Sequence, residues 1–140
     1  MDNMYIASMR INTSRYEQEL IELQTLLQQR DLSNLEYRAA ERSLQISIEA
    51  CIGIAKHWAK HKTGHRANDA YQSFEQLSQT GEITLDDLKN WRKVIGLRNA
   101  LVHDYLNIDA EIVRSIIKNS FYKQLFDFIK IGLIALENIE

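Results

Sequence analysis

The stretch RNALVHDY, residues 98–105, places an arginine, an asparagine, a histidine and a tyrosine close together. An imidazole has an ordinary pKa of about 6.5, so it can take up or release a proton near neutral pH. A guanidinium is a permanent cation whose planar fork matches the oxygens of a phosphate. Arg98 and His103 could therefore supply a fixed cation and an acid–base group at a reacting phosphate.

This pair of groups suits the cleavage of RNA without a metal ion. The ribose 2′-OH then acts as an internal nucleophile, and the reaction needs a group that titrates near neutral pH and a cation for the phosphorane charge. Arg98 and His103 are the candidate catalytic residues. Asn99 could hold the imidazole or a phosphate oxygen, and Tyr105 could hydrogen-bond the phosphate or the ribose. The products would carry a 2′,3′-cyclic phosphate or its hydrolysis product.

The spacing of the motif sets a geometric problem. Arg98 and His103 are five positions apart, which is about 140° around a helix at about 100° per residue. They would not meet on one straight helix, whereas Asn99 and His103 would be neighbours. Either the helix ends or kinks near His103, or two copies of the chain assemble the site. A plainer alternative makes Arg98 half of a surface salt bridge and His103 a residue at a helix C-terminus.

The apolar spacing is helical along most of the chain, which predicts an all-α fold. We expect an antiparallel bundle of about five helices, because the connections between them are short. The first helix should begin at the capping box of Ser14 to Glu17, and the second at the capping box of Ser33 to Glu36 and end near Lys60. Further helices are expected at 68–79, from 84 through the motif, and from about 110 to 138 behind an N-cap at Asp109. The expected core positions include Tyr16, Leu20, Leu23, Leu27, Leu44, Ile48, Cys51, Ala55, Tyr71, Phe74, Leu77, Leu85, Leu88, Trp91, Ile95, Ile112, Ile116, Leu125, Phe128, Ile129 and Leu136.

Length and composition indicate one domain, residues 1–140. The chain has no proline and a formal net charge of -2, so long helices are expected and a global attraction to nucleic acid is not. Its one cysteine, Cys51, lies on an apolar stripe and should be buried. We see neither a signal peptide nor a membrane span, and expect a cytoplasmic protein.

Two basic segments interrupt this mildly acidic chain. Residues 50–68 and residues 88–103 contain no Asp or Glu. In a bundle the two segments could lie on one side of the motif and contact a polyanion, or they could be ordinary solvated helix faces. The candidate RNA-binding residues are Lys56, Lys60, Arg92 and Lys93.

The run HWAKHKTGH spaces His57, His61 and His65 four residues apart, as a transition-metal site on a helix would. Gly64 should break the helix before the third histidine, and no acidic ligand is nearby. We therefore expect no metal site and no cofactor.

With these residues in view, RNALVHDY resembles the signature of the HEPN superfamily, in which an arginine and a polar residue precede a histidine by a few positions. The tyrosine two residues after the histidine makes it similar to the HepT-like toxins. The short all-helical chain, and the LNID stretch before the expected last helix, fit the same family.

The resemblance implies a homodimer in which two motifs face each other across a cleft, and a metal-independent ribonuclease that acts as a toxin on tRNA or another cellular RNA. It also implies a partner, a MntA-like nucleotidyltransferase antitoxin of the type VII kind, which would neutralise the toxin by adding AMP to Tyr105. A second possibility is a non-catalytic HEPN module that partners a nucleotidyltransferase or binds nucleotide or RNA without cutting. A third is a helical bundle whose motif only stabilises a dimer.

Overall fold

The computed structural model describes residues 2–139, and within them all the regular elements are helices. Its elements are α1 (Asn3–Gln29), α2 (Asn34–Thr63), α3 (Ala70–Gln79), α4 (Leu85–His103), the short 3₁₀ helix η1 (Tyr105–Asn107), α5 (Ala110–Lys118) and α6 (Lys123–Glu137). The expected helical bundle is confirmed. None of the described helices combines the length and the apolar character that a membrane span requires.

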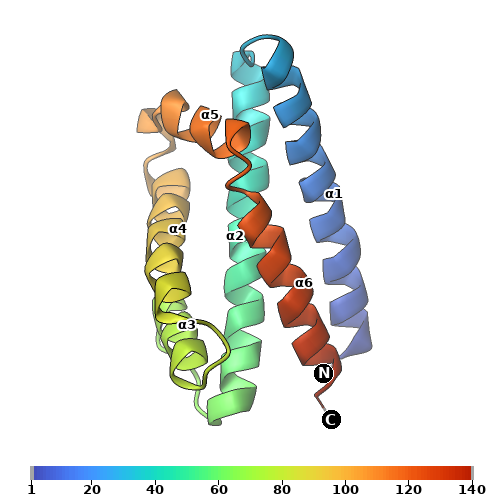
Figure 1. Cartoon of the computed structure of the whole chain (residues 1–140), viewed down its shortest axis with the longest axis vertical. Helices are drawn as coiled ribbons and strands as arrows, with labels where there is room; N and C mark the ends of the chain where they lie inside the picture. The colour runs from blue at the N-terminus through green and yellow to red at the C-terminus, as the bar shows by residue number, and fades with distance from the viewer. Residues whose placement is uncertain (1, 140) are drawn as a thin grey trace.

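The long helices lie side by side, and α5 crosses one end of the bundle (Figure 1). In that view α1 and α4 run upward while α2 and α6 run downward, so the two termini lie together at the bottom. The helix α2 contacts each of α1, α3, α4, α5 and α6, which makes it the central element. The motif at the end of α4 therefore lies near α5, at the end of the bundle away from the termini.

The predicted start of the first helix at Ser14 is wrong. The helix α1 begins at Asn3, and the Asp2 side chain caps it by accepting a hydrogen bond from the Met4 amide at 2.8 Å. The side chain of Thr13, next to the expected cap, is buried and donates to the carbonyl of Met9 at 2.6 Å. The residues before Ser14, including buried Ile6, pack against the rest of the protein. This packing keeps them helical, so the helix does not begin at the capping sequence of Ser14 to Glu17.

The other predicted helix starts hold within two residues. Ser33 and Glu36 form the expected capping box of α2, and Thr84 forms one with Asp87 at α4. The helix α2 continues to Thr63, a little beyond the expected end at Lys60, because Gly64 closes it in the left-handed conformation at φ 75°. Asp69 caps α3, so that helix begins two residues after the expected position 68.

The single helix expected from about 110 to 138 is two helices. The helix α5 ends at Lys118, Ser120 adopts a left-handed φ of 58°, and α6 starts at Lys123 in a new direction (Figure 1). Gln24 of α1 donates to the Ser120 hydroxyl at 2.7 Å and its side-chain oxygen accepts from buried Tyr122. This contact with α1 holds a bend that the apolar periodicity of the segment did not indicate.

Aromatic side chains from four helices form the centre of the core. The Phe74 and Trp91 rings stack with their centres 4.4 Å apart. The centre of the Phe128 ring lies 4.8 Å from that of Trp91 and 6.0 Å from that of Trp58. Cys51 is buried as expected. Two predicted core positions are wrong, because Leu85 is 71% exposed and Ile112 is 52% exposed. Leu85 lies in the first turn of α4, and Ile112 lies at the edge of a surface hollow beside α5.

Candidate active site

The last two turns of α4 carry the motif. Arg98 is half-buried and His103 is exposed. The helix ends at His103, where the amide of Asp104 donates to the carbonyl of Ala100 at 2.9 Å. Because both side chains are still on helical backbone, they point about 140° apart, and no hydrogen bond within residues 2–139 joins them. One chain does not bring the guanidinium and the imidazole together.

Asn99 orients the arginine. The Nε of Arg98 donates to Oδ1 of Asn99 at 3.0 Å. The sequence predicted that Asn99 would contact either the His103 imidazole or a phosphate oxygen. In the structure it contacts the Arg98 guanidinium instead. The amide nitrogen of Asn99 has no hydrogen-bond acceptor in the described part of the chain, so it can donate to an incoming oxygen.

A tight turn follows the motif. The side chain of Asn107 donates to Oδ1 of Asp104 at 2.7 Å, and its backbone amide donates to the Asp104 carbonyl at 2.9 Å. Asp109 then caps α5 as expected, accepting from the amide of Glu111 at 2.9 Å. The backbone of Tyr105 begins η1, while its side chain lies outside the described part of the structure.

A polar cluster that the sequence did not indicate anchors the element after this turn. Arg114 of α5 donates from Nε to the Tyr37 hydroxyl at 2.8 Å and from Nη2 to Oδ2 of Asp31 at 3.1 Å. The Tyr37 hydroxyl in turn donates to Oδ1 of Asp31 at 2.5 Å. The hydrogen bonds from Tyr37 and Arg114 lower the pKa of Asp31, and burial raises the pKa of Tyr37. Because its members lie on α5, α2 and the α1–α2 connection, no local sequence signal could reveal this cluster.

Two of the candidate RNA-binding residues lie away from the motif. Lys56 and Lys60 line a cleft of about 720 Å³ between α2 and the segment 66–68. The neighbouring Lys62 pairs with Glu82 at 2.9 Å, which places this end of α2 beside the start of α4. In Figure 1 the cleft and the motif therefore lie toward opposite ends of the bundle.

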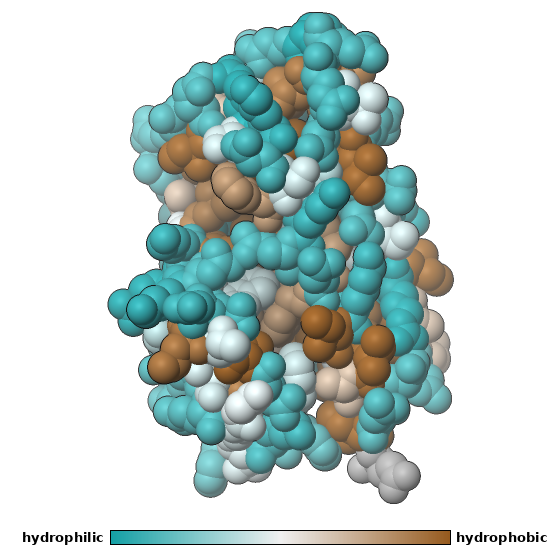
Figure 2. All heavy atoms as spheres, in the orientation of Figure 1, coloured by the Kyte–Doolittle hydropathy of each residue, from teal (hydrophilic) through white to brown (hydrophobic). Residues whose placement is uncertain are grey.

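The other two candidates are on α4 itself. The guanidinium of Arg92 lies 4.7 Å from the centre of the Tyr71 ring on α3. Lys93 borders an apolar hollow of about 420 Å³ between α4, α5 and α6, together with Leu97, Ile112 and Phe121. Figure 2 shows apolar atoms in this hollow, below the α5 crossing.

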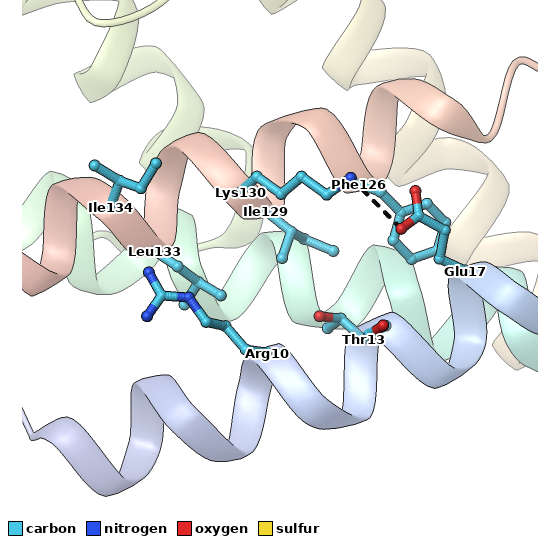
Figure 3. A pocket seen from close by; sticks show the side chains of 9 residues that line it. Arg10, Thr13, Glu17, Phe126, Ile129, Lys130, Leu133 and Ile134 are labelled. Carbon is cyan, nitrogen blue, oxygen red and sulfur yellow. Dashed lines mark ion pairs between the residues drawn. The ribbon is translucent and has the colours of Figure 1, made fainter.

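A second groove, between α1 and α6, has a different character. Phe126, Ile129 and Leu133 form its apolar floor (Figure 3). Its charged rim is neutralised, because Lys130 pairs with Glu17 at 3.5 Å and Arg10 pairs with Glu137 at 2.6 Å. The groove offers neither a free cation nor a group of the motif to a reacting phosphate.

The three histidines at positions 57, 61 and 65 do not come together in one site. His57 packs edge-on against the Tyr5 ring at 5.2 Å, and His65 follows the helix end at Gly64. Among residues 2–139 no three His, Cys, Asp or Glu side chains are placed to hold a metal ion together.

Comparison with known protein families shows which family the chain belongs to. The family model described as "Ribonuclease HepT-like" matches residues 14–131, which includes the whole motif. The chain belongs to the HepT-like ribonuclease family. Two curated relatives support this membership. The chain is 34% identical over 90 residues to the mRNA nuclease HepT of Shewanella oneidensis, covering 63% of this chain and 68% of the relative. It is 31% identical over 121 residues to a protein of Archaeoglobus fulgidus named as an RNase, covering 86% of this chain and 90% of that relative.

A solved structure shares the HepT-like fold. It is the crystal structure of a toxin–antitoxin with AMP-PNP, which matches with a TM-score of 0.73 at 25% identity and covers 92% of this chain and 99% of that one.

Proposed function

We propose that this HepT-like chain is the toxin of a type VII toxin–antitoxin pair and acts as a metal-independent endoribonuclease on tRNA or another cellular RNA in the cytoplasm. The observation that carries the proposal is the intact Arg98 and His103 pair at the end of α4, in a chain of the HepT-like ribonuclease family. The names of its curated relatives, an mRNA nuclease and an RNase, support the same reaction.

The chemistry follows from the two side chains. The 2′-oxygen forms a bond to the adjacent phosphorus and loses its proton, while the bond to the 5′-oxygen breaks and that oxygen gains a proton. His103 exchanges one of these protons, and Arg98 stabilises the extra charge on the phosphorane oxygens. Asn99 holds the guanidinium through its Oδ1, which leaves its amide nitrogen for the phosphate.

A homodimer resolves the divergence of the two side chains. Two copies of α4 that face each other bring Arg98 of one protomer toward His103 of its partner. The apolar hollow beside α4 supports such an assembly, because Phe121 and Ile112 at its edge are 53% and 52% exposed in the single chain. Apolar side chains left open to water beside a functional motif are typical of a protein interface.

Regulation would act on Tyr105. We propose that a MntA-like nucleotidyltransferase antitoxin adds AMP to this hydroxyl, and that the bulky anionic adduct fills the cleft and repels RNA phosphates. Tyr105 begins η1 directly beyond the end of α4, within two residues of His103. The AMP-PNP in the similar toxin–antitoxin structure is consistent with a nucleotide-using partner.

The basic residues extend the contact with RNA. Arg92 and Lys93 lie on α4 one to two turns before Arg98, where they can attract the phosphates that flank the cleaved bond. Lys56 and Lys60 lie farther along the molecule and would contact a more distant part of the substrate.

The test is cleavage of total tRNA by the purified chain in EDTA, next to His103→Ala, with the intact mass recorded to detect an adduct on Tyr105. Cleavage by the wild type alone, with 2′,3′-cyclic phosphate ends, is the expected result. No cleavage by an unmodified, dimeric wild type on tRNA or mRNA would favour the non-catalytic binding module instead.

A further inference from the structure

The cleft beside Lys56 and Lys60 is open, polar and cationic. One wall is α2, through Gly53, Lys56, His57 and Lys60, and the other is the connection to α3, through Arg66, Ala67 and Asn68. Its volume of about 720 Å³ is that of a ligand-binding cleft. In Figure 1 this part of α2 lies toward the end at which the chain turns into α3, opposite the α5 crossing.

The cations of this cleft have no acidic partner. Lys56, Lys60 and Arg66 are exposed and form no ion pair with any described residue, and no Asp or Glu lines the cleft. Other cations of the molecule do pair, for example Lys62 with Glu82 and Lys130 with Glu17. Like charges four residues apart on a helix repel each other, so the proximity of Lys56 and Lys60 costs α2 stability, although Lys60 lies in the last turn, where the helix dipole favours a cation. Their arrangement instead fits an anion that bridges them.

The opposite wall is held in place by its own hydrogen bonds. Gly64 reverses the chain at φ 75°, and the amide of His65 donates to the Thr63 hydroxyl at 3.1 Å. The amide of Asn68 donates to the Gln72 side chain at 2.5 Å. The nearest acid along the chain, Asp69, is committed to the cap of α3, where it accepts from the Gln72 amide at 2.8 Å. Arg66 is thus presented on an ordered connection with no carboxylate to neutralise it.

We infer that this cleft is a second binding site for the phosphate backbone of the RNA substrate, separate from the motif; the inference rests on the ribonuclease function proposed above. The cleft offers several cations and a polar lining, but its lining residues include no aromatic side chain other than the His57 ring, so it suits phosphates better than bases. It lies toward the end of the bundle where α2 turns into α3, whereas the motif lies at the far end of α4, a helix of 19 residues and about 28 Å. An RNA held here reaches the motif only if it is long enough to span α4.

The variant Lys56→Ala/Lys60→Ala tests this second site. With tRNA as substrate, KM should rise about tenfold or more while kcat stays unchanged, because the chemistry at Arg98 and His103 is untouched. With a short oligonucleotide that cannot span α4, both constants should match the wild type. The salt dependence of binding to poly(U), measured by fluorescence anisotropy in the His103→Ala background, should lose about one unit of slope for each lysine removed.

The matched control is Arg38→Ala/Arg42→Ala. These two exposed arginines have the same spacing on the same helix, and their removal changes the net charge equally, but they lie at the other end of α2. Equal weakening by both double variants would mean a general charge effect and would overturn the second site. So would unchanged tRNA binding by the lysine variant, or a changed oligomeric state in sedimentation, which would make the cleft a protein interface.

The anisotropy measurement also separates this inference from the proposed function. If the wild type cuts RNA and the lysine variant binds it normally, the second site is wrong and the ribonuclease stands. If the wild type cuts nothing but the lysine variant alone loses poly(U) affinity, the cleft binds RNA in a protein that is not a nuclease.

Discussion

Arg114 and Asp31 lie 83 positions apart in the chain and are joined by a hydrogen-bonded ion pair, with Nη2 3.1 Å from Oδ2. The pair ties α5 to the connection between α1 and α2. Since α5 begins directly after the turn that follows the motif, this contact fixes the element that positions residues 104–109.

Removing the hydroxyl that completes this cluster should weaken the fold. Tyr37→Phe leaves the buried ring in place but removes one hydrogen bond to Asp31 and one from Arg114. We expect the free energy of unfolding to fall by about 1 kcal/mol, measured by urea denaturation. Tyr16→Phe, at a half-buried tyrosine away from the cluster, is the control. Equal losses in the two variants would mean that the cluster adds no stability.

Acid should destabilise the protein through two carboxylates. Hydrogen bonds from Arg30 and from the Ser33 amide lower the pKa of Glu36 to about 2, and those from Tyr37 and Arg114 lower the pKa of Asp31. A lowered folded-state pKa means that the stabilisation is present above the ordinary carboxyl pKa, near 4, and is lost as the pH falls toward 2. The melting temperature should drop across this range, and less steeply for Glu36→Gln. Parallel curves for the two proteins would contradict this.

Two helical glycines should respond oppositely to alanine. A Cβ at Gly132 would overlap Cγ2 of Ile54, which is fully buried and cannot move away, whereas a Cβ at Gly96 would meet nothing. Gly96→Ala should stabilise α4 by up to about 1 kcal/mol through helix propensity. Gly132→Ala should be less stable than Gly96→Ala by about 1–3 kcal/mol, because the core is overpacked. Thermal unfolding of both variants measures the difference, and equal shifts would refute the packing argument.

Arg98→Lys should separate charge from geometry in the proposed reaction. Lysine keeps the positive charge but lacks the planar fork and the Nε donor that contacts Asn99. We expect kcat for RNA cleavage to fall about 100-fold, with little change in melting temperature because Arg98 makes no other hydrogen bond within residues 2–139. Full activity of Arg98→Lys would show that a point charge is sufficient.

Cys51 should be chemically silent in the folded protein. Its side chain is completely buried, its Sγ lies 3.3 Å from the Leu125 carbonyl, and burial raises the pKa of the thiol well above its usual value. Because the thiolate is the reactive form, a thiol reagent should label Cys51 only after unfolding. Rapid labelling under native conditions, followed by mass spectrometry, would contradict the packing around α2 and α6.

Much of the fold was readable from local patterns. The capping box at Ser33, the helix start at Thr84, the buried Cys51 and the cap at Asp109 were all predicted correctly, because each depends on residues within a few positions of one another. The start of α1 and the break before α6 were not. The first depends on the packing of Ile6 and Thr13, and the second on the contact of Gln24 with Ser120 and Tyr122.

The same division applies to the site. The sequence by itself determined the residue types of the motif, their place at the end of a helix, and the divergence of Arg98 from His103, since helical geometry follows from spacing alone. Only the tertiary structure decided that Lys56 and Lys60 share a cleft with Arg66 away from the motif, and that Arg114 anchors α5. These relationships join residues from different elements, and their distances depend on how the helices pack rather than on any local pattern.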